Sequence, residues 1–321
     1  MFALLFSLAA AAPLRAAKTL DIYFVDTEGG QATLIAAPSG QALLIDTGYA
    51  GNSGRDADRI AAAAKAAGVK KIDYLLLTHH HPDHAGGVPS LLERLPVLNF
   101  LDHGPNVESA NQYDPAYAQA YAKGSHQVIK PGDAIPVKGL DIKILAAGGK
   151  FIGGPGDANP HCAGLAPVEG ESGENPHSAA LLIQFGKFRF ANLGDLMYNG
   201  ELALECPENK LGKVDLYITT HHATHVPPKS VHGAAPKVIV MNNGARKGGS
   251  PDAWRLLRQS PGLADIWQLH FSVAGGKDAN APDAFIANVD ERDQGQYIKV
   301  SASEDGSFTV FNQRNKYTKR Y

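Results

Sequence analysis

The sequence has no excess of either charge and no long apolar run. Its 30 Lys and Arg residues balance 32 Asp and Glu residues, for a net charge of −2. It therefore lacks the basic excess that is typical of general nucleic-acid-binding proteins. A nuclease is not excluded, because bound metal ions can supply positive charge to a phosphate. The apolar run at residues 1–12 is too short to span a bilayer comfortably, and no later segment reaches the required length.

The chain is also poor in cysteine, with only Cys162 and Cys206. Export would permit a disulfide between them, but two buried free thiols suit the sequence equally well. Residues 1–17 predict a signal peptide, because an apolar run ends in several alanines. The alternative is an apolar helix of the mature protein. We therefore expect a secreted or periplasmic protein with a single domain over residues 18–321.

The most informative segment is residues 78–84, which read Thr-His-His-His-Pro-Asp-His. It follows an apolar run at residues 72–77 that predicts a buried strand. Imidazole nitrogens and carboxylate oxygens are the ligands of zinc and similar divalent ions. A purification tag would be a pure histidine run at a terminus, without the interleaved Pro82 and Asp83. The spacing allows one short loop to supply ligands to two adjacent metals.

Strand and helix signals alternate along both halves of the chain. We expect strands at residues 20–25, 32–35, 42–45, 72–77, 179–183, 188–191, 214–219 and 237–241, and a C-terminal hairpin over 296–311. We expect helices at residues 55–67, through 91–95 and at 251–259. The segment at about 148–177 is rich in Gly and Pro and predicts an irregular loop, either a lid or a disordered insertion. Two β-rich halves with helices predict an α/β (α+β) fold, a four-layered αββα sandwich with the metal site at one edge.

Five segments together resemble one known family. They are residues 24–35, the Leu-Ile-Asp-Thr-Gly of residues 44–48, the histidine cluster of 79–84, the Leu-Gly-Asp of 193–195, and residues 215–222. In this order they resemble the metallo-β-lactamase superfamily. Within it, they are most similar to the hydrolase domain of ComEC-type DNA-uptake proteins and its stand-alone secreted relatives. The resemblance covers most of residues 19–315 and implies the αββα fold.

The chain departs from that pattern at three places. The first turn reads Glu-Gly-Gly-Gln at residues 28–31, and Ala223 and Thr224 replace the usual Gly-Ser. The loop at residues 243–251 lacks the histidine of the Gly-His-Pro that often ends the ligand set. The last ligand must then come from His221 or His222, from a distant residue such as His270, or from water.

The resemblance implies two divalent metal ions, most commonly zinc, with manganese or iron as alternatives. It implies metal ligands and catalytic aspartates, a residue that orients a ligand, and residues near the substrate. The implied metal ligands are His79, His81, His177, Asp83, His84, Asp195, His221 and His222. Of these, Asp83 and Asp195 are also implied to be catalytic, and Asp195 to bridge the metals. Asp46 is implied to orient a ligand, and Asn175 is an alternative to His177. Strand-like alternation favours His222 over His221 and points His80 away from the metals.

The predicted reaction is hydrolysis by a metal-activated hydroxide, because a bound divalent ion lowers the pKa of water from ~15.7 to near neutrality. We expect a phosphodiester substrate, in a nuclease or phosphodiesterase acting on a small molecule, nucleotide or nucleic acid. Arg246 and Lys247 stand in a Gly-rich loop and either neutralise a phosphate or form a solvated basic turn.

Two other functions stay open. One is hydrolysis of a lactone, thioester or β-lactam on the same scaffold, although Asp195 argues against a true β-lactamase. The other is a non-catalytic binding protein on a decayed scaffold, which only the missing histidine favours.

Overall fold

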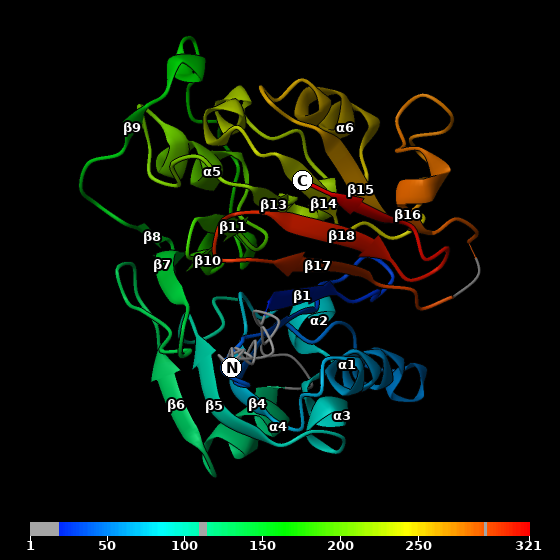
Figure 1. The fold of residues 1–321 in the computed structure, drawn as a ribbon. Coiled ribbons are helices and arrows are strands. Elements are labelled where there is room, and N and C mark those ends of the chain that lie inside the picture. The colour runs from blue at the N-terminus through cyan, green and yellow to red at the C-terminus, as the bar shows by residue number, and fades with distance from the viewer. Residues whose placement is uncertain (1–18, 109–113, 292–293) are drawn as a thin grey trace, which may run out of the picture.

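The structure is a computed structural model that describes residues 19–108, 114–291 and 294–321. The predicted signal peptide at residues 1–17 lies outside the described residues. Within them, the chain forms two large β-sheets that face each other, with helices on the outer sides (Figure 1).

The first sheet has nine strands in the order β19-β18-β17-β1-β2-β3-β4-β5-β6. Its strands are β1 (Leu20–Phe24), β2 (Thr33–Ala36), β3 (Ala42–Ile45), β4 (Ile72–Leu76), β5 (Val97–Asp102), β6 (Ser125–Val128), β17 (Ile298–Ala302), β18 (Phe308–Asn312) and β19 (Thr318–Arg320). The four strands from β3 to β6 are parallel. Their carboxyl ends therefore meet at one edge of the sandwich.

The second sheet has eight strands in the order β16-β15-β14-β13-β11-β10-β7-β8. Its strands are β7 (Asp141–Ala147), β8 (Lys150–Phe151), β10 (Ala180–Phe185), β11 (Phe188–Asn192), β13 (Leu216–Ile218), β14 (Val238–Met241), β15 (Asp265–His270) and β16 (Ile286–Asn288). The five strands β11, β13, β14, β15 and β16 run parallel. A separate pair joins β9 (Asp157–Ala158) to β12 (Glu208–Asn209).

Alternation along the strands builds three apolar layers. In β3, Leu43 and Ile45 belong to the core between the two sheets, whereas Leu44 packs under the helices of the first sheet. In β14, Val240 faces the same central core and Ile239 the outer helices of the second sheet. Successive strand residues point to opposite faces, so both sheets are covered on both sides.

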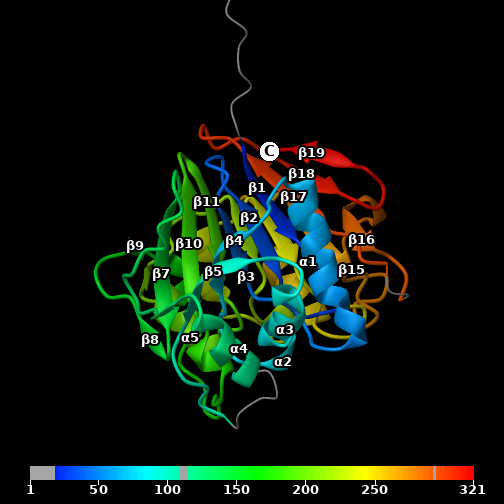
Figure 2. The same cartoon turned by 90° about the horizontal axis from the view of Figure 1, so that it is seen from below.

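Six α-helices in the described part of the chain cover these outer faces. They are α1 (Arg55–Ala66), α2 (Pro82–Ala85), α3 (Val88–Leu92) and α4 (Asp114–Tyr121) on the first sheet, with α5 (Tyr198–Glu205) and α6 (Pro251–Arg258) on the second. Figure 2 shows the same molecule from below, with α1 to α5 labelled beside the strands. The four-layered αββα sandwich expected from the sequence is confirmed.

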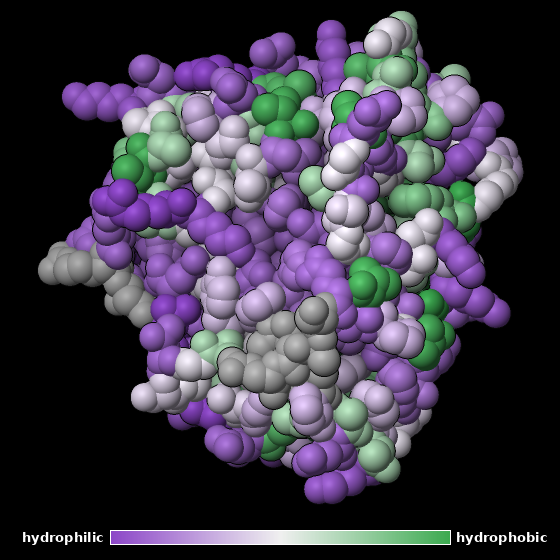
Figure 3. All heavy atoms as spheres, turned by 180° about the vertical axis from the view of Figure 1, so that it is seen from behind, coloured by the Kyte–Doolittle hydropathy of each residue, from purple (hydrophilic) through white to green (hydrophobic). Residues whose placement is uncertain are grey.

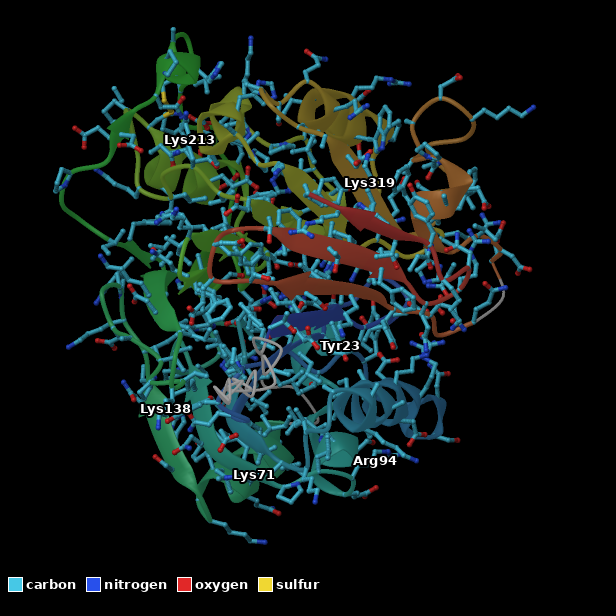
Figure 4. The ribbon with its side chains drawn as sticks, in the orientation of Figure 1. Tyr23, Lys71, Arg94, Lys138, Lys213 and Lys319 are labelled. Atoms are coloured by element: carbon cyan, nitrogen blue, oxygen red, sulfur yellow. A yellow bond between two sulfur atoms is a disulfide. The ribbon has the colours of Figure 1, made fainter. Side chains whose placement is uncertain are left out.

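The outer surface is charged. Lys71, Arg94 and Lys138 lie on its periphery (Figure 4). None of the described helices combines the length and the apolar composition that a bilayer crossing needs.

The segment at residues 148–177 is irregular, as expected, but it is fastened at several points. Cys162 and Cys206 form a disulfide, so the alternative of two free thiols is wrong. The Nδ2 of Asn159 donates to the main-chain oxygens of Glu205 and Ser230, each at 2.9 Å. These contacts pin the segment to α5 and to the 3₁₀ helix at Lys229–Ala234.

Candidate metal centre

The site lies where strands of both sheets end. Asp46 follows β3, and the histidine cluster follows β4 and runs into α2. Asp195 follows β11, and the short turn Thr220–Ala223 follows β13. Ligand sites in sheets of parallel strands are commonly found at the carboxyl ends of the strands. Figure 2 places α2 to α5 on the side opposite to the viewer of Figure 1, and Figure 3 shows hydrophilic residues gathered at the centre of that face.

Four buried side chains converge at this edge. Their ligand atoms are Asp83 Oδ2, His84 Nε2, Asp195 Oδ2 and His222 Nε2. His84 Nε2 lies 3.2 Å from His222 Nε2, 3.5 Å from Asp83 Oδ2 and 3.2 Å from Asp195 Oδ2. His222 Nε2 lies 3.1 Å from Asp83 Oδ2 and 3.3 Å from Asp195 Oδ2.

These separations fit a tetrahedral zinc ion. Zinc bonds of about 2.0–2.1 Å, arranged tetrahedrally, separate the ligand atoms by about 3.3–3.4 Å. The five measured distances, 3.1–3.5 Å, scatter around that value. The donor set of two imidazoles and two carboxylates is also one that zinc accepts.

The charges of the cluster suit a cation. Burial opposes ionisation of His84, but Asp195, Asp83 and Asp46 more than offset it and hold the pKa of His84 well above its ordinary value. Burial likewise opposes ionisation of Asp195, yet His222 and His84 hold its pKa well below the usual range. The carboxylates thus favour positive charge between them, and a divalent ion bound there would supply it in place of imidazole protons.

Asp46 orients His84 from behind. Its Oδ2 accepts hydrogen bonds from His84 Nδ1 at 2.8 Å and from the Thr78 hydroxyl at 2.7 Å, and its Oδ1 accepts from the Thr78 amide at 2.7 Å. A neutral ring that donates from Nδ1 keeps its lone pair on Nε2, which faces the cluster. Asp46 is fully buried and has a φ of 61°. A Cβ at the neighbouring Gly87 would overlap the carbonyl of Thr47, so α3 and the Asp46 turn pack closely because Gly87 has no side chain.

A second group of donors lies on the other side of Asp195. His79 is fully buried, and its Nε2 lies 4.0 Å from Asp195 Oδ2 without a hydrogen-bond partner. Asp195 Oδ1 is likewise buried without a partner. Burial, with a contribution from His84, holds the pKa of His79 well below its ordinary value. A neutral imidazole beside an unpaired carboxylate oxygen can bind a second cation that shares Asp195 with the first.

The remaining predicted ligands of this second position differ in placement. His81 stands next to His79, with ring centroids 4.7 Å apart, but its Nε2 lies 3.3 Å from Glu108. His177 is not a member of the four-residue group; its Nδ1 bonds to the carbonyl oxygen of Gly173 at 2.8 Å, and its ring lies beside that of His103, with centroids 6.1 Å apart. Asn175 instead lies 3.3 Å from His221 Nε2. Of the two alternatives, the structure thus places Asn175 beside the cluster.

His221 and His222 both reach the site, which strand-like alternation did not anticipate. The turn that carries them is left-handed, with φ of 46° at His221, 55° at His222 and 56° at Ala223. His222 enters the tetrahedral group, while His221 Nε2 lies 3.9 Å from Asp195 Oδ2. Burial, with a contribution from His222, lowers the pKa of His221 to about 4. His222, and no residue of the loop at 243–251, completes the four-residue group.

The basic loop sends one side chain to the site. Lys247 donates to Asp83 Oδ2 and, at 3.0 Å, to the hydroxyl of Tyr49. Arg246 points outward and pairs with Glu291 at 2.8 Å.

Two further histidines serve other contacts. His270 lies 2.7 Å from Asp26 Oδ1 and is not a member of the four-residue group. His80 turns to the opposite side of its loop, where its amide donates to Glu174 Oε2 at 2.8 Å and its Nε2 bonds to Gly104 O at 2.9 Å.

Glu174, which the sequence analysis did not identify, also bonds to His103 Nε2 at 3.0 Å and accepts from the Val107 amide at 2.6 Å. It therefore joins the histidine loop to residues 103–108.

The family model of the metallo-beta-lactamase superfamily matches residues 25–170 of this chain. A hydroxyacylglutathione hydrolase of Erwinia tasmaniensis is 39% identical over 79 residues, which are 25% of this chain and 26% of that protein. The chain thus aligns with about a quarter of the length of this curated relative.

Two solved structures are similar to this chain in their backbone. The metallo-beta-lactamase fold protein YhfI from Bacillus subtilis has a TM-score of 0.49 at 12% identity, covering 78% of this chain and 96% of YhfI. Tm1679, described as a metal-dependent hydrolase of the beta-lactamase superfamily, has a TM-score of 0.46 at 14% identity, covering 79% of this chain and 97% of Tm1679. Over residues 25–170 the chain is thus similar to the metallo-beta-lactamase superfamily, and that stretch contains the histidine cluster of residues 79–84.

Proposed function

We propose that this protein is a metal-dependent hydrolase of phosphodiester bonds that works with two divalent ions. The observation that carries the proposal is the tetrahedral group of Asp83, His84, Asp195 and His222, with unpaired His79 Nε2 and Asp195 Oδ1 beside it. The first ion would be held by the tetrahedral group. The second would be held by His79 and Asp195, with His81, Asn175 and His221 next to them. Bound ions would lower the pKa of a water and stabilise charge on the leaving oxygen.

The protein's own side chains have separate tasks in this proposal. Asp46 keeps the Nε2 of His84 turned toward the cluster. Asp195 is shared by the two positions and keeps them close together. Lys247 is the one described basic side chain whose ammonium group contacts the cluster, through Asp83. Once a cation engages Asp83, the ammonium group would be released to meet an anionic oxygen of the substrate.

Two features support a phosphodiester over other esters. Lys247 supplies positive charge beside the cluster, where a phosphate oxygen would lie. The sequence motifs resemble those of the ComEC-type hydrolase domains, for which a nuclease or phosphodiesterase activity is expected.

A second candidate is hydrolysis of a thioester or lactone. The segment of 79 residues that is 39% identical to a hydroxyacylglutathione hydrolase favours it. Both reactions use the same metal centre, so the substrate distinguishes them.

We further propose that the protein acts outside the cytoplasm. The apolar N-terminal sequence and the Cys162–Cys206 disulfide support this location.

Hydrolysis of bis-p-nitrophenyl phosphate by zinc- or manganese-loaded protein tests the proposed function. The same preparation should be assayed with a thioester, a lactone and a β-lactam, and again after chelation. We expect chelator-sensitive turnover of the phosphodiester that Asp195→Asn abolishes. Turnover of the thioester or lactone alone would support the second candidate and reject the first.

A further inference from the structure

The turn that carries His221 and His222 has an unfavourable backbone. Three consecutive residues without a glycine, His221 to Ala223, have left-handed φ values of 46°, 55° and 56°. L-residues avoid this region, and such conformations persist only where the surrounding contacts enforce them. The contacts of this turn therefore decide where the imidazole of His222 lies.

One carboxylate reaches both ends of the turn. Glu201, on α5, is fully buried, and its Oε1 accepts a short hydrogen bond from the hydroxyl of Thr220. The same Oε1 lies 3.3 Å from Nε2 of His225. Thr220 immediately precedes the left-handed residues and His225 follows them closely. Glu201 thus holds the flanks of the turn from one point.

The same helix is tied to the shared aspartate. Asp195 lies in the short connection between β11 and α5, six positions before Glu201 in the sequence. The amide of His221 donates to the carbonyl oxygen of Gly194 at 3.2 Å, so the turn also contacts this connection directly. Asp195 and His222 therefore lie on two different loops, with Oδ2 and Nε2 3.3 Å apart. Glu201 links these loops, because its helix follows Asp195 and its carboxylate contacts the flanks of the turn.

We propose that Glu201 is a positioning residue of the metal centre, which fixes the turn of His221 and His222 against Asp195 and so sets the affinity of the tetrahedral site. This inference rests on the proposed metal binding but not on the identity of the substrate. Glu201 touches neither the substrate nor the four ligand atoms in this scheme; it acts through Thr220 and His225. Because outer contacts of this kind orient the ligands of a metal, their loss weakens metal binding.

The chain offers a matched control one helical turn further on. Glu205 also lies on α5 and is also fully buried, but its Oε2 accepts from the Ser230 hydroxyl at 2.6 Å and it does not contact the turn. Burial, with the nearby charge of Glu201, raises the pKa of Glu205 well above its ordinary value. Glu205→Gln is therefore a near-isosteric replacement of a buried acid in the same environment.

The test measures zinc affinity by competition with a fluorescent chelator, for the wild type and for Glu201→Ala, Glu201→Gln, Thr220→Val and Glu205→Gln. We expect Glu201→Ala to weaken zinc binding about 10–100-fold, and Thr220→Val to weaken it in the same direction. Glu201→Gln retains an acceptor for Thr220 and should recover part of the affinity. Glu205→Gln should stay within about twofold of the wild type. The visible spectrum of the cobalt-loaded protein, which reports ligand geometry, should change in Glu201→Ala and not in Glu205→Gln.

Two results would overturn the inference. If Glu201→Ala and Thr220→Val bind zinc as tightly as Glu205→Gln does, Glu201 does not position the site, although the proposed function stands. If the wild type binds no zinc, the proposed function fails and this inference fails with it. Should Glu201→Ala not fold, Thr220→Val and Glu201→Gln decide the matter in the same assay.

Discussion

The Nδ1 of His84 lies 2.8 Å from the Oδ2 of Asp46, which comes from a different strand end. This contact joins two segments that are 38 residues apart, and it fixes which imidazole nitrogen faces the cluster. The hydroxyl of Thr78 donates to the same oxygen at 2.7 Å, so the carboxylate is held in turn. The orientation of the His84 imidazole is thus set by Asp46 and Thr78, which are not members of the four-residue group.

Replacing Asp46 by Asn should weaken zinc binding about 10–100-fold. The NH2 group that replaces one carboxylate oxygen would face either the Thr78 amide or the Thr78 hydroxyl and His84 Nδ1, and it cannot accept from any of them. Chelator competition measures the change. Asp73→Asn is the control, since Asp73 is also buried in the first sheet but accepts from the Ala42 amide at 2.9 Å and is no part of the cluster. Equal zinc affinities for the two variants would remove Asp46 from the account.

Lys247 and Arg246 provide a pair of neighbouring cations with different surroundings. Lys247→Ala should lower kcat/KM for bis-p-nitrophenyl phosphate about tenfold or more, the expected loss of one charge-assisted hydrogen bond. Arg246→Ala should leave it within about twofold, because Arg246 pairs with Glu291 at the surface. An uncharged lactone substrate should not distinguish the variants. If both variants lose phosphodiester turnover equally, Lys247 has no special role in binding the anion.

Glu174 should make the fold sensitive to acid. Despite its burial, the hydrogen bonds from His103 and from the amides of Val107 and His80 lower its pKa from 4.5 to about 2. Since the folded-state pKa is depressed, the stabilisation is present above about pH 4.5 and is lost as the pH falls toward 2. We expect Glu174→Gln to reduce the free energy of unfolding by about 2–3 kcal/mol at neutral pH.

Urea unfolding of the wild type and Glu174→Gln between pH 2 and pH 7 measures this effect. The gap in unfolding free energy between the two proteins should be constant near neutrality and should close below pH 4.5. Glu93→Gln, at an exposed glutamate, is the control and should show no such gap. A gap that does not depend on pH would show that the carboxylate charge of Glu174 is not the cause.

The sequence was sufficient for the central features of the fold and for the main segments that meet at the candidate site. The apolar run before the histidine cluster becomes β4, and the other predicted strands and the helices α1 and α6 are confirmed within a few residues. These segments have a clear apolar period and Gly or Pro at their ends, so local physics determines them. Several strands were not identified, among them β5, β6, β7, β15, β16 and β19. All four residues of β6 are exposed, and β15 buries Gln268 and His270, so neither has the usual alternation.

The placement of His221 against His222, and of His177 against Asn175, could be seen only in the three-dimensional structure. Alternation along a strand cannot describe His221 and His222, because the turn is left-handed and brings both rings to one side. His177 and Asn175 are equally plausible in the sequence, and only the structure shows that Asn175 lies 3.3 Å from His221 Nε2. Glu174 and Glu201 lack any local pattern, since their partners lie far away in the chain. The pairing of Cys162 with Cys206 is of the same kind.

The central claim is that the tetrahedral group binds a metal ion. The most direct test is metal content by mass spectrometry, for protein loaded with zinc and then desalted, compared with the double variant Asp83→Asn, His84→Ala. The account predicts two ions per wild-type chain, with the ion of the tetrahedral group lost in the variant. A wild-type chain that retains neither zinc nor manganese would contradict it.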